Sequence, residues 1–428
     1  MKCNDTICAI STAPGGAVGI VRISGPEAIS IADKIFHGSR VLSERKAGTI
    51  AFGTIEADGS VLDEVLVSIF RAPHSYTGED AVEIACHGSA YILNKVVELL
   101  IANGCRMATA GEYTKRAFLN GKMDLSQAEA VADLIAADSR ASHCIALHQM
   151  RGGISLRLKD LRKKLLELTS LLELELDFSE EDVEFADRSR LLALAEDTAA
   201  EISRLTATFN DGNALRNGVP VAIIGAPNVG KSTLLNALLH DDKAIVSSVS
   251  GTTRDTIEDT VTLDGILFRF IDTAGLHHTT DTIEKMGIER TMRAAKQARI
   301  IIMMTEPGVP YPAIDAAEGQ TIIKITNKTP GFQAINGIGL PELEQKLVAA
   351  VPQANNDTVL ITNVRHKQAL DLALTDILRA IASLRNKVTG DLVTEDLRQC
   401  IAHLAEIVGE ISSQAVLENI FKNFCVGK

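Results

Sequence analysis

The stretch from Val219 to Thr233, VPVAIIGAPNVGKST, constrains the fold more than any other part of the chain. Its continuous apolar run, Val221–Ile224, predicts a strand buried on both faces, and the leucines that follow Lys231 predict a helix. The loop between them, Gly225–Ser232, follows the pattern G-x-x-x-x-G-K-S/T. Its glycines let backbone N–H groups turn onto a phosphate, and the helix N-terminus adds a favourable dipole. The stretch therefore predicts a phosphate-binding α/β domain.

Two later segments complete a predicted site for GTP and Mg²⁺. A loop that contains Thr253 can supply this hydroxyl to the same magnesium that Ser232 holds. The strand Ile266–Ile271 ends at Asp272, which can reach magnesium through water, and Gly275 can offer its N–H to the γ-phosphate. Three segments in this order predict a GTPase-type switch protein. The predicted nucleotide-site residues are Asn228, Val229, Gly230, Lys231, Ser232, Thr233, Ser247, Ser248, Val249, Ser250, Gly251, Thr252, Thr253, Asp272, Thr273, Ala274, Gly275, Asn327 and Lys328.

Length and composition limit the remaining possibilities. A chain of 428 residues is expected to hold about three domains. The net charge of −12 shows no global basic surface for nucleic acid, so any RNA contact must be local or depend on a partner. The seven scattered cysteines lack zinc-ligand spacing and predict reduced thiols, and no apolar run is long enough for a membrane span. We therefore expect a cytoplasmic protein with no signal peptide and no membrane contact.

The patterns along the chain predict four segments. Residues 1–120 form an α/β domain with a hairpin across Asp58-Gly59, and residues 121–214 are mostly helical, with leucines spaced three and four residues apart. Residues 215–352 form the nucleotide domain, and helices resume in 353–428, at Val359–Leu384 and Leu392–Ile411. The acidic stretch Glu180–Glu184 is better explained by a solvated helix connection than by a metal site. The nucleotide domain is thus inserted in a helical domain.

Four further stretches carry a resemblance to a known family. They are GIVRISGP from Gly19, SYTGEDAVE from Ser75, GEYTKRAFLNGKMDL from Gly111, and the ending FCVGK from Phe424. With the switch segments, they make the whole chain resemble the MnmE or TrmE family, which modifies the wobble uridine of tRNA. The resemblance implies an N-terminal α/β folate-binding-like domain, a helical domain, and an inserted Ras-like P-loop G domain with a parallel-rich sheet.

The resemblance also implies an activity and partners. The family forms a homodimer through the N-terminal domain and works with the flavoprotein MnmG as a heterotetramer, with FAD and NADH on that partner. Together they add an aminomethyl or carboxymethylaminomethyl group at C5 of the wobble uridine. The one-carbon unit comes from 5-formyltetrahydrofolate or methylenetetrahydrofolate. By resemblance, Arg22, Glu83, Lys122 and Lys428 lie around the folate, and Cys425 is the cysteine needed for modification.

The resemblance assigns catalytic roles in the G domain too. The family has no arginine finger, and K⁺ occupies that position when two G domains pair. Lys231 and Glu284 match the phosphate-binding lysine and the glutamate that helps orient the attacking water. The residues that match the potassium site are Asn228, Ser247, Val249 and Thr252.

The guanine-reading motif departs from the family. An Asn-Lys-x-Asp loop is expected after the strand Thr321–Thr326, but the chain has Asn327-Lys328-Thr329-Pro330. The next base-contacting element best matches Ala334–Asn336. A hydrogen bond to a charged group contributes about 1.5–3 kcal/mol, so the loss of two predicts weaker guanine binding.

Two other classes compete with the leading interpretation. A regulatory GTPase, such as a ribosome-assembly switch, needs neither the folate-like positions nor the FCVGK ending. A degenerate scaffold that no longer hydrolyses GTP is favoured by Pro330. The residues that argue against it are Lys231, Ser232, Thr253, Asp272 and Glu284.

Overall fold

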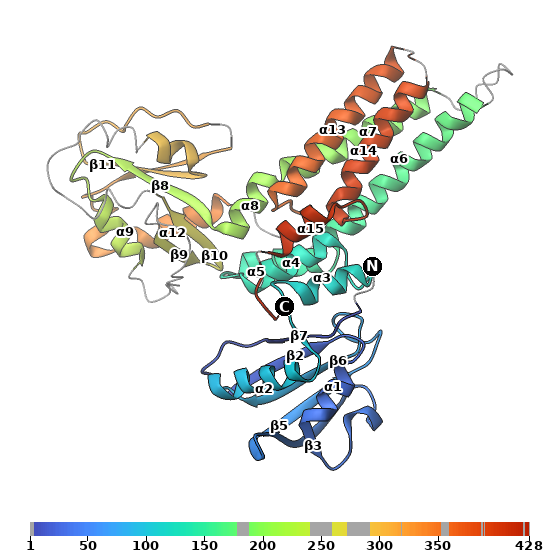
Figure 1. The fold of residues 1–428 in the computed structure, drawn as a ribbon. Coiled ribbons are helices and arrows are strands. Elements are labelled where there is room, and N and C mark those ends of the chain that lie inside the picture. Colours follow the sequence, from blue (N-terminus) through green and yellow to red (C-terminus); the bar gives the residue numbers. More distant parts are fainter. Residues whose placement is uncertain are drawn as a thin grey trace. The chain divides into compact units, whose positions relative to one another are not determined.

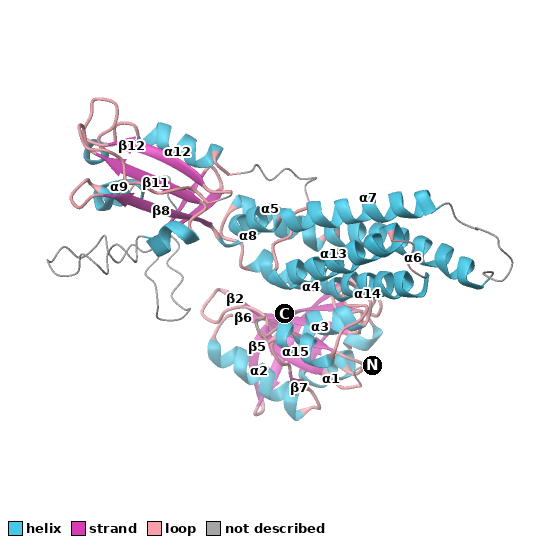
Figure 2. Ribbon diagram, turned by 90° about the horizontal axis from the view of Figure 1, so that it is seen from above, coloured by secondary structure: helices cyan, strands magenta, loops and turns pink. Residues whose placement is uncertain are grey.

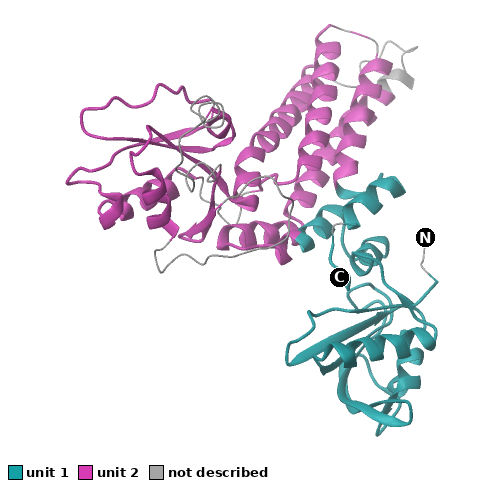
Figure 3. Cartoon of the chain, turned by 60° about the vertical axis from the view of Figure 1, so that its left-hand side comes forward, with its two compact units in different colours: residues 1–132, 408–428 teal, residues 133–407 magenta. Residues whose placement is uncertain are grey.

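The structure is a computed structural model, and it describes residues 4–177, 188–239, 259–271, 292–317, 319–351, 359–386, 388, 390–422 and 424–427. The chain divides into two compact units (Figure 3). Unit 1 contains Met1–Ala132 and Val408–Lys428, and unit 2 contains Asp133–Ile407. The two ends of the chain therefore belong to the same unit, and the long middle part forms the other. The four segments predicted from the sequence were defined by sequence patterns and not by contacts, so they stay a prediction.

A seven-stranded sheet forms the centre of unit 1 (Figure 1). Its order is β3-β4-β5-β6-β2-β1-β7, and neighbouring strands are antiparallel except for the parallel pair β1 and β7. Its strands are β1 (Ile7–Ile10), β2 (Val18–Ser24), β3 (Phe36–Gly38), β4 (Thr49–Ala57), β5 (Ser60–Phe70), β6 (Ala81–His87) and β7 (Arg106–Met107). The hairpin between β4 and β5 turns at Asp58 and Gly59, both with positive φ, as its Asp-Gly sequence predicts.

Two helices cover one face of this sheet, and the C-terminal residues join a second cluster. Helices α1 (Ala28–Ile35) and α2 (Ala90–Ala102) bury their apolar sides against the strands. A smaller core contains Leu125, Ala128, Leu417 and Phe421. The other helices of this part are η1 (Leu42–Glu44), α3 (Glu112–Leu119), α4 (Leu125–Ile135) and α15 (Gln414–Phe421).

A five-stranded sheet of order β12-β11-β8-β10-β9 lies in unit 2. The strands β8 (Val219–Gly225), β10 (Ile266–Phe270), β11 (Ile300–Thr305) and β12 (Thr321–Thr326) are parallel neighbours, and β9 (Asp259–Leu263) is antiparallel. One face packs on α9 (Lys231–Leu239) and α12 (Leu340–Ala349), and the other on a helix at 292–297. Burial of both faces explains why the strands are continuously apolar.

Among the described residues, the remaining helices of unit 2 comprise four long ones of 19 to 25 residues and two short ones of 9 and 11 residues (Figure 2). Helix α7 packs against both α6 and α13, and the leucines of α6 predicted to form its seam, Leu158 to Leu172, are buried. The helices are α5 (Arg140–Met150), α6 (Gly153–Asp177), α7 (Arg188–Ala207), α8 (Phe209–Asn217), α13 (Val364–Arg385) and α14 (Gly390–Val408). The helix predicted from Val359 begins later, at Val364, because the Asn363 side chain caps it by accepting from the Arg365 N–H. The acidic stretch Glu180–Glu184 lies outside the described residues.

Candidate functional site

The loop that follows β8 has the backbone shape that a phosphate site requires. Strand β8 ends at Gly225, helix α9 begins at Lys231, and Asn228 and Gly230 both have positive φ. A Cβ atom at Gly225 would lie 2.5 Å from the Met304 carbonyl oxygen, and one at Gly230 would lie 2.5 Å from Asn327 Nδ2. Only glycine fits at these two positions. The backbone shape that glycine allows places the N–H groups of the loop at the start of α9.

The Lys231 side chain lies over this loop. Its Nζ donates to the carbonyl oxygens of Gly225 and Ala226, each at 2.9 Å. Burial lowers the pKa of the Lys231 ammonium from its usual value. Ser232 and Thr233 follow in the first turn of α9, so their hydroxyls lie at the same helix end. A cation held by backbone carbonyls at a helix N-terminus can exchange these contacts for phosphate oxygens.

Asn327 joins the phosphate loop to the loop predicted to read the base. This residue is 4% exposed and follows β12. Its Nδ2 donates to the Val229 carbonyl oxygen at 2.8 Å, and its Oδ1 accepts from the Ala334 N–H at 3.1 Å. Both bonds are buried, so one side chain fixes the phosphate loop and the 3-10 helix η3 (Ala334–Asn336) relative to each other.

Lys328 and Pro330 occupy the rest of the base loop. Lys328 has positive φ, and its Nζ forms an ion pair with Glu306, just beyond the end of β11. Thr329 and Phe332 form a bridge that closes a tight turn over Pro330, and the sequence from Asn327 to Asn336 contains no carboxylate. Sequence reasoning missed Glu306, although a carboxylate just after a parallel strand beside the phosphate-loop strand is a signal that could have identified it.

Several predicted residues lie outside the described part of the chain. These are Ser247, Ser248, Val249, Ser250, Gly251, Thr252, Thr253, Asp272, Thr273, Ala274, Gly275, Glu284 and Lys428. The predicted nucleotide-site residues that the structure describes do gather at one edge of the five-stranded sheet. They are Asn228 to Thr233, Asn327 and Lys328.

A second cluster in unit 1 contains Arg22 and Glu83. They face each other on the antiparallel strands β2 and β6, with Arg22 Nε and Nη2 at 2.9 and 2.7 Å from Glu83 Oε1. The Arg22 guanidinium lies 5.7 and 5.6 Å from the ring centroids of Tyr76 and Tyr113. Sequence reasoning named neither tyrosine as a site residue, although both belong to the stretches that carry the resemblance. The cluster offers a cation, a carboxylate and two aromatic rings.

The C-terminal segment lies against the same cluster. Arg22 Nη1 donates to the Gly427 carbonyl oxygen at 3.3 Å, and the Gly111 N–H donates to the Cys425 carbonyl oxygen at 3.3 Å. The Cys425 thiol is exposed and forms no disulfide. Lys122, also exposed, donates to the Pro73 carbonyl oxygen at 3.0 Å, on the loop that contains Tyr76. The fold thus brings three of the predicted residues, Arg22, Glu83 and Cys425, into one region.

A buried ion-pair network holds that loop in place. Arg116 is 1% exposed and binds Glu79 at 3.3 Å, Glu112 at 3.0 Å and Asp5 at 2.7 Å. Burial alone would raise the pKa of the Glu112 carboxyl, but hydrogen bonds from Arg106, the Thr109 backbone and Arg116 lower it to about 2. Because the three carboxylates come from three separate segments, the network fixes the loop relative to α3 and the N-terminal strand.

Models of known protein families match nearly the whole chain. The model described as the MnmE helical domain matches residues 125–425, and that of the N-terminus of the GTP-binding protein TrmE matches residues 6–122. The chain belongs to the MnmE (TrmE) family. This membership confirms the family and the mixed fold predicted from the sequence, with an α/β N-terminal part, long helices and a parallel-rich sheet.

Relatives of the MnmE family resemble the chain from end to end. It is 52% identical to the tRNA modification GTPase MnmE of Bacteroides thetaiotaomicron and 53% identical to that of Bacteroides fragilis. Both alignments span 462 residues and cover 99% of this chain and 99% of the relative. Because the alignments are longer than the 428 residues of the chain, both relatives contain residues with no counterpart here. Among solved structures, Era in complex with MgGDPNP and nucleotides of 16S ribosomal RNA matches 36% of this chain and 65% of its own, with 22% identity and a TM-score of 0.22.

The described residues also bear on the expected membrane and metal contacts. In the described ranges, no helix is long and apolar enough to cross a membrane. The same residues contain no group of three His, Cys, Asp or Glu side chains arranged to hold a metal ion. The predicted metal ligands in this MnmE-family chain are of another kind, namely hydroxyl, amide and backbone groups.

Proposed function

We propose that the chain is a GTP-hydrolysing enzyme that takes part in tRNA modification. The phosphate loop is the observation that supports this most, since Gly225, Gly230 and Asn327 fix its backbone and Lys231 lies at its mouth. Family membership supports the role in tRNA modification, because the relatives are named tRNA modification GTPases. We expect the protein to act in the cytoplasm, where its substrate is found.

The residues of the site have separate roles in this proposal. Lys231 binds the outer phosphates, and Ser232 with Thr253 holds Mg²⁺, which neutralises charge on the phosphate oxygens. Ser232 fits this role because its hydroxyl lies in the helical turn directly after Lys231. Asp272 holds the magnesium through water, Gly275 donates to the γ-phosphate, and Glu284 orients the attacking water.

We further propose a K⁺ site at Asn228, Ser247, Val249 and Thr252. The positive φ of Asn228 turns the loop backbone at the position where the two loops would share the ion. Oxygen and amide ligands suit an alkali cation, which supplies the positive charge that an arginine finger provides in other GTPases.

The cluster around Arg22 supports a folate site in unit 1. A cation beside a carboxylate fits tetrahydrofolate, whose glutamate is an anion and whose pterin has N–H donors. Lys122 and Lys428 add positive charge in the proposal, and the bound folate supplies the one-carbon unit. Cys425 belongs to a segment that contacts this cluster through Gly427, so its thiol is suited to the modification chemistry.

The outer face of the unit 1 sheet supports a homodimer. Ile50 and Phe52 on β4 are each 64% exposed, and Leu66 on β5, which pairs with Phe52, is 49% exposed. Neighbouring exposed apolar side chains on a sheet mark an interaction surface. We propose that a second copy covers this face, and that the flavoprotein MnmG, with FAD and NADH, completes a heterotetramer for the reaction at C5 of the wobble uridine.

Mass spectrometry of tRNA nucleosides tests the overall function. The purified chain, MnmG, GTP, FAD, NADH, methylenetetrahydrofolate and a nitrogen donor should together convert the wobble uridine of added tRNA, to the aminomethyl form with ammonium and to the carboxymethylaminomethyl form with glycine. Omission of the chain, or use of Lys231→Ala, should abolish the product. Product formed equally well without the chain would contradict the proposal.

Calorimetry tests the folate site separately. Wild-type protein should bind 5-formyltetrahydrofolate, and Arg22→Ala or Glu83→Ala should abolish the binding heat. Glu98→Ala is the control, because Glu98 is exposed on α2 and lies outside the cluster. No heat with wild-type protein at millimolar folate would reject the site.

A further inference from the structure

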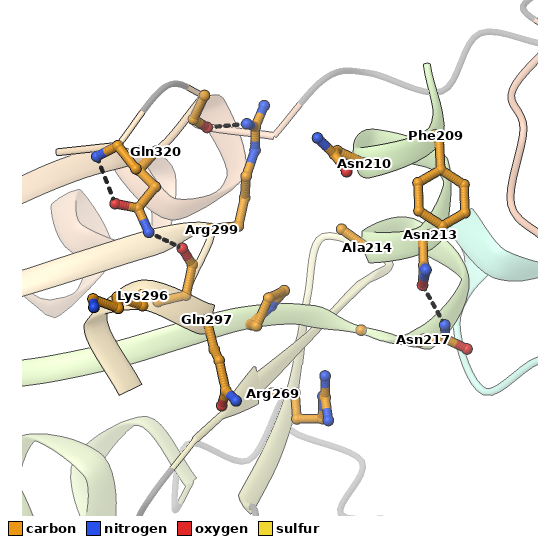
Figure 4. Close-up of a pocket in the computed structure, with 15 residues that line it drawn as sticks. Phe209, Asn210, Asn213, Ala214, Asn217, Arg269, Lys296, Gln297, Arg299 and Gln320 are labelled. Carbon is orange, nitrogen blue, oxygen red and sulfur yellow. Dashed lines mark hydrogen bonds between the residues drawn. The ribbon is translucent and has the colours of Figure 1, made fainter. Parts of the chain in front are cut away.

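A second cavity lies at the opposite end of β8 from the phosphate loop (Figure 4). It has a volume of about 390 Å³ and is formed within unit 2, between α8 and the start of the five-stranded sheet. We call it the α8 pocket. Gly218 and Pro220 line it, whereas the phosphate loop begins at Gly225, so about 17 Å of strand separates the two sites. The α8 pocket is therefore distinct from the nucleotide site.

The two walls of the α8 pocket carry different chemistry. Helix α8 contributes the amide side chains of Asn210, Asn213 and Asn217 and the ring of Phe209 (Figure 4). The opposite wall contributes the cations Arg269, Lys296 and Arg299, of which Arg299 is ion-paired with Asp211. The described lining residues include no carboxylate, and Glu318 lies outside the described part of the chain. This positive surface is notable in a chain with a net charge of −12.

Hydrogen bonds hold the cationic wall in place. Arg299 Nη2 binds Asp211 Oδ1 at 2.8 Å, and its Nη1 donates to the Gly319 carbonyl oxygen. Gln320 Nε2 donates to the carbonyl oxygens of Ala295 and Ala298, each at 2.7 Å, and so fixes the end of the helix at 292–297. All of these bonds are made within the chain itself, which suits a small-ligand site, since such sites are usually largely pre-formed.

We propose that the α8 pocket binds one nucleotide unit of an RNA strand, and specifically of the tRNA substrate. Lysine and arginine bind backbone phosphates, while amide side chains and aromatic rings bind base edges and base faces. The phosphate meets the cationic wall, and the base lies against α8. The charge of the whole chain requires RNA contacts to be local, and this pocket supplies such a contact. The inference rests on the proposed function, because it takes tRNA as the substrate.

Binding of labelled tRNA to the full chain at saturating GTP, from 50 to 200 mM salt, tests the two walls separately. Lys296→Gln should raise the Kd about three- to tenfold and reduce the salt slope by about one, because one phosphate contact is lost. Asn213→Ala should raise the Kd with the slope unchanged, since an amide contributes no counterion release. Arg293→Gln is the matched control, because Arg293 is exposed on the same helix and does not line the pocket.

The outcomes separate this inference from the proposed function. If Lys296→Gln behaves like Arg293→Gln, the pocket is not an RNA site, although tRNA modification measured by mass spectrometry still stands. Wild-type protein that binds no tRNA would also overturn the inference. Inorganic phosphate and cytidine monophosphate are the probes for a small ligand. If either binds at micromolar concentration with a Kd that Lys296→Gln raises, and does not compete with tRNA, the pocket binds a free phosphate compound instead of RNA.

Discussion

The strongest structural prediction concerns Asn327, which links the phosphate loop to η3. In Asn327→Ala, the Val229 carbonyl and the Ala334 N–H lose their buried partner. A buried polar group left unpaired costs about 1–3 kcal/mol, so the two together lower the free energy of local opening by about 2–6 kcal/mol. Because most domains are stable by only about 5–15 kcal/mol, this substitution removes a large share of the stability of this region.

Hydrogen exchange measured by mass spectrometry resolves this effect, since a chain with several units does not unfold in one step. Peptides that cover residues 229–235 and 327–336 should exchange about 30- to 10⁴-fold faster, because each 1.4 kcal/mol corresponds to a factor of ten. The control is Asn336→Ala, an exposed asparagine whose Nδ2 donates only to the Gln333 side chain. Equal exchange in Asn327→Ala and Asn336→Ala would refute the argument that Asn327 holds the two loops together.

Four other predictions concern the nucleotide site and Glu112. Lys231→Ala should abolish tight GTP binding while light scattering shows an unchanged oligomer, and a monomeric variant would contradict the assignment of dimerisation to unit 1. GTP hydrolysis should be faster in potassium than in sodium at matched ionic strength, because sodium is too small for the proposed site, and equal rates would rule that site out. ATP should compete with labelled GTP better in the wild type than in Pro330→Asp, since Pro330 offers no acceptor for guanine; equal competition would show that another residue reads the base. Finally, the folded-state pKa of Glu112 is about 2, which lies below its usual value. The folding stability that the Glu112 carboxylate contributes is therefore fully present above about pH 4.5 and is lost as the pH falls towards 2. Thermal melts of Glu112→Gln should therefore depend less on pH in this window than those of the wild type, and identical pH profiles would contradict this.

Local patterns predicted much of the fold. The Asp58-Gly59 hairpin, the leucine seam of α6 and the strand–loop–helix at Gly225–Lys231 each depend on neighbours in the sequence. Periodicity and turn chemistry determine such features without knowledge of the rest of the chain. The predicted start of α13 was too early because hydrophobic periodicity does not show that the Asn363 side chain caps the helix at its N-terminus.

Contacts between distant residues could not be predicted in this way. The ion pair between Lys328 and Glu306 depends on the order of β11 and β12 in the sheet, which periodicity does not give. Arg22 and Glu83 are 61 positions apart in the sequence, and their pairing requires the register of β2 and β6. Resemblance named these two residues, but only the fold shows that they form an ion pair between two tyrosine rings.

The contact between Arg22 and Gly427 sets a limit on the order of events during protein synthesis. The two residues are 405 positions apart, yet they belong to one compact unit. Ribosomes add about 5–20 residues per second, so the N-terminal partner waits about 20–80 s for the C-terminal one. For about 15–60 s of that time, Leu125 and Ala128 lack the apolar partners Leu417 and Phe421. The first part of the chain to be made is thus completed only by the last, and a nascent chain stalled anywhere in unit 2 would expose this unfinished surface to chaperones and proteases.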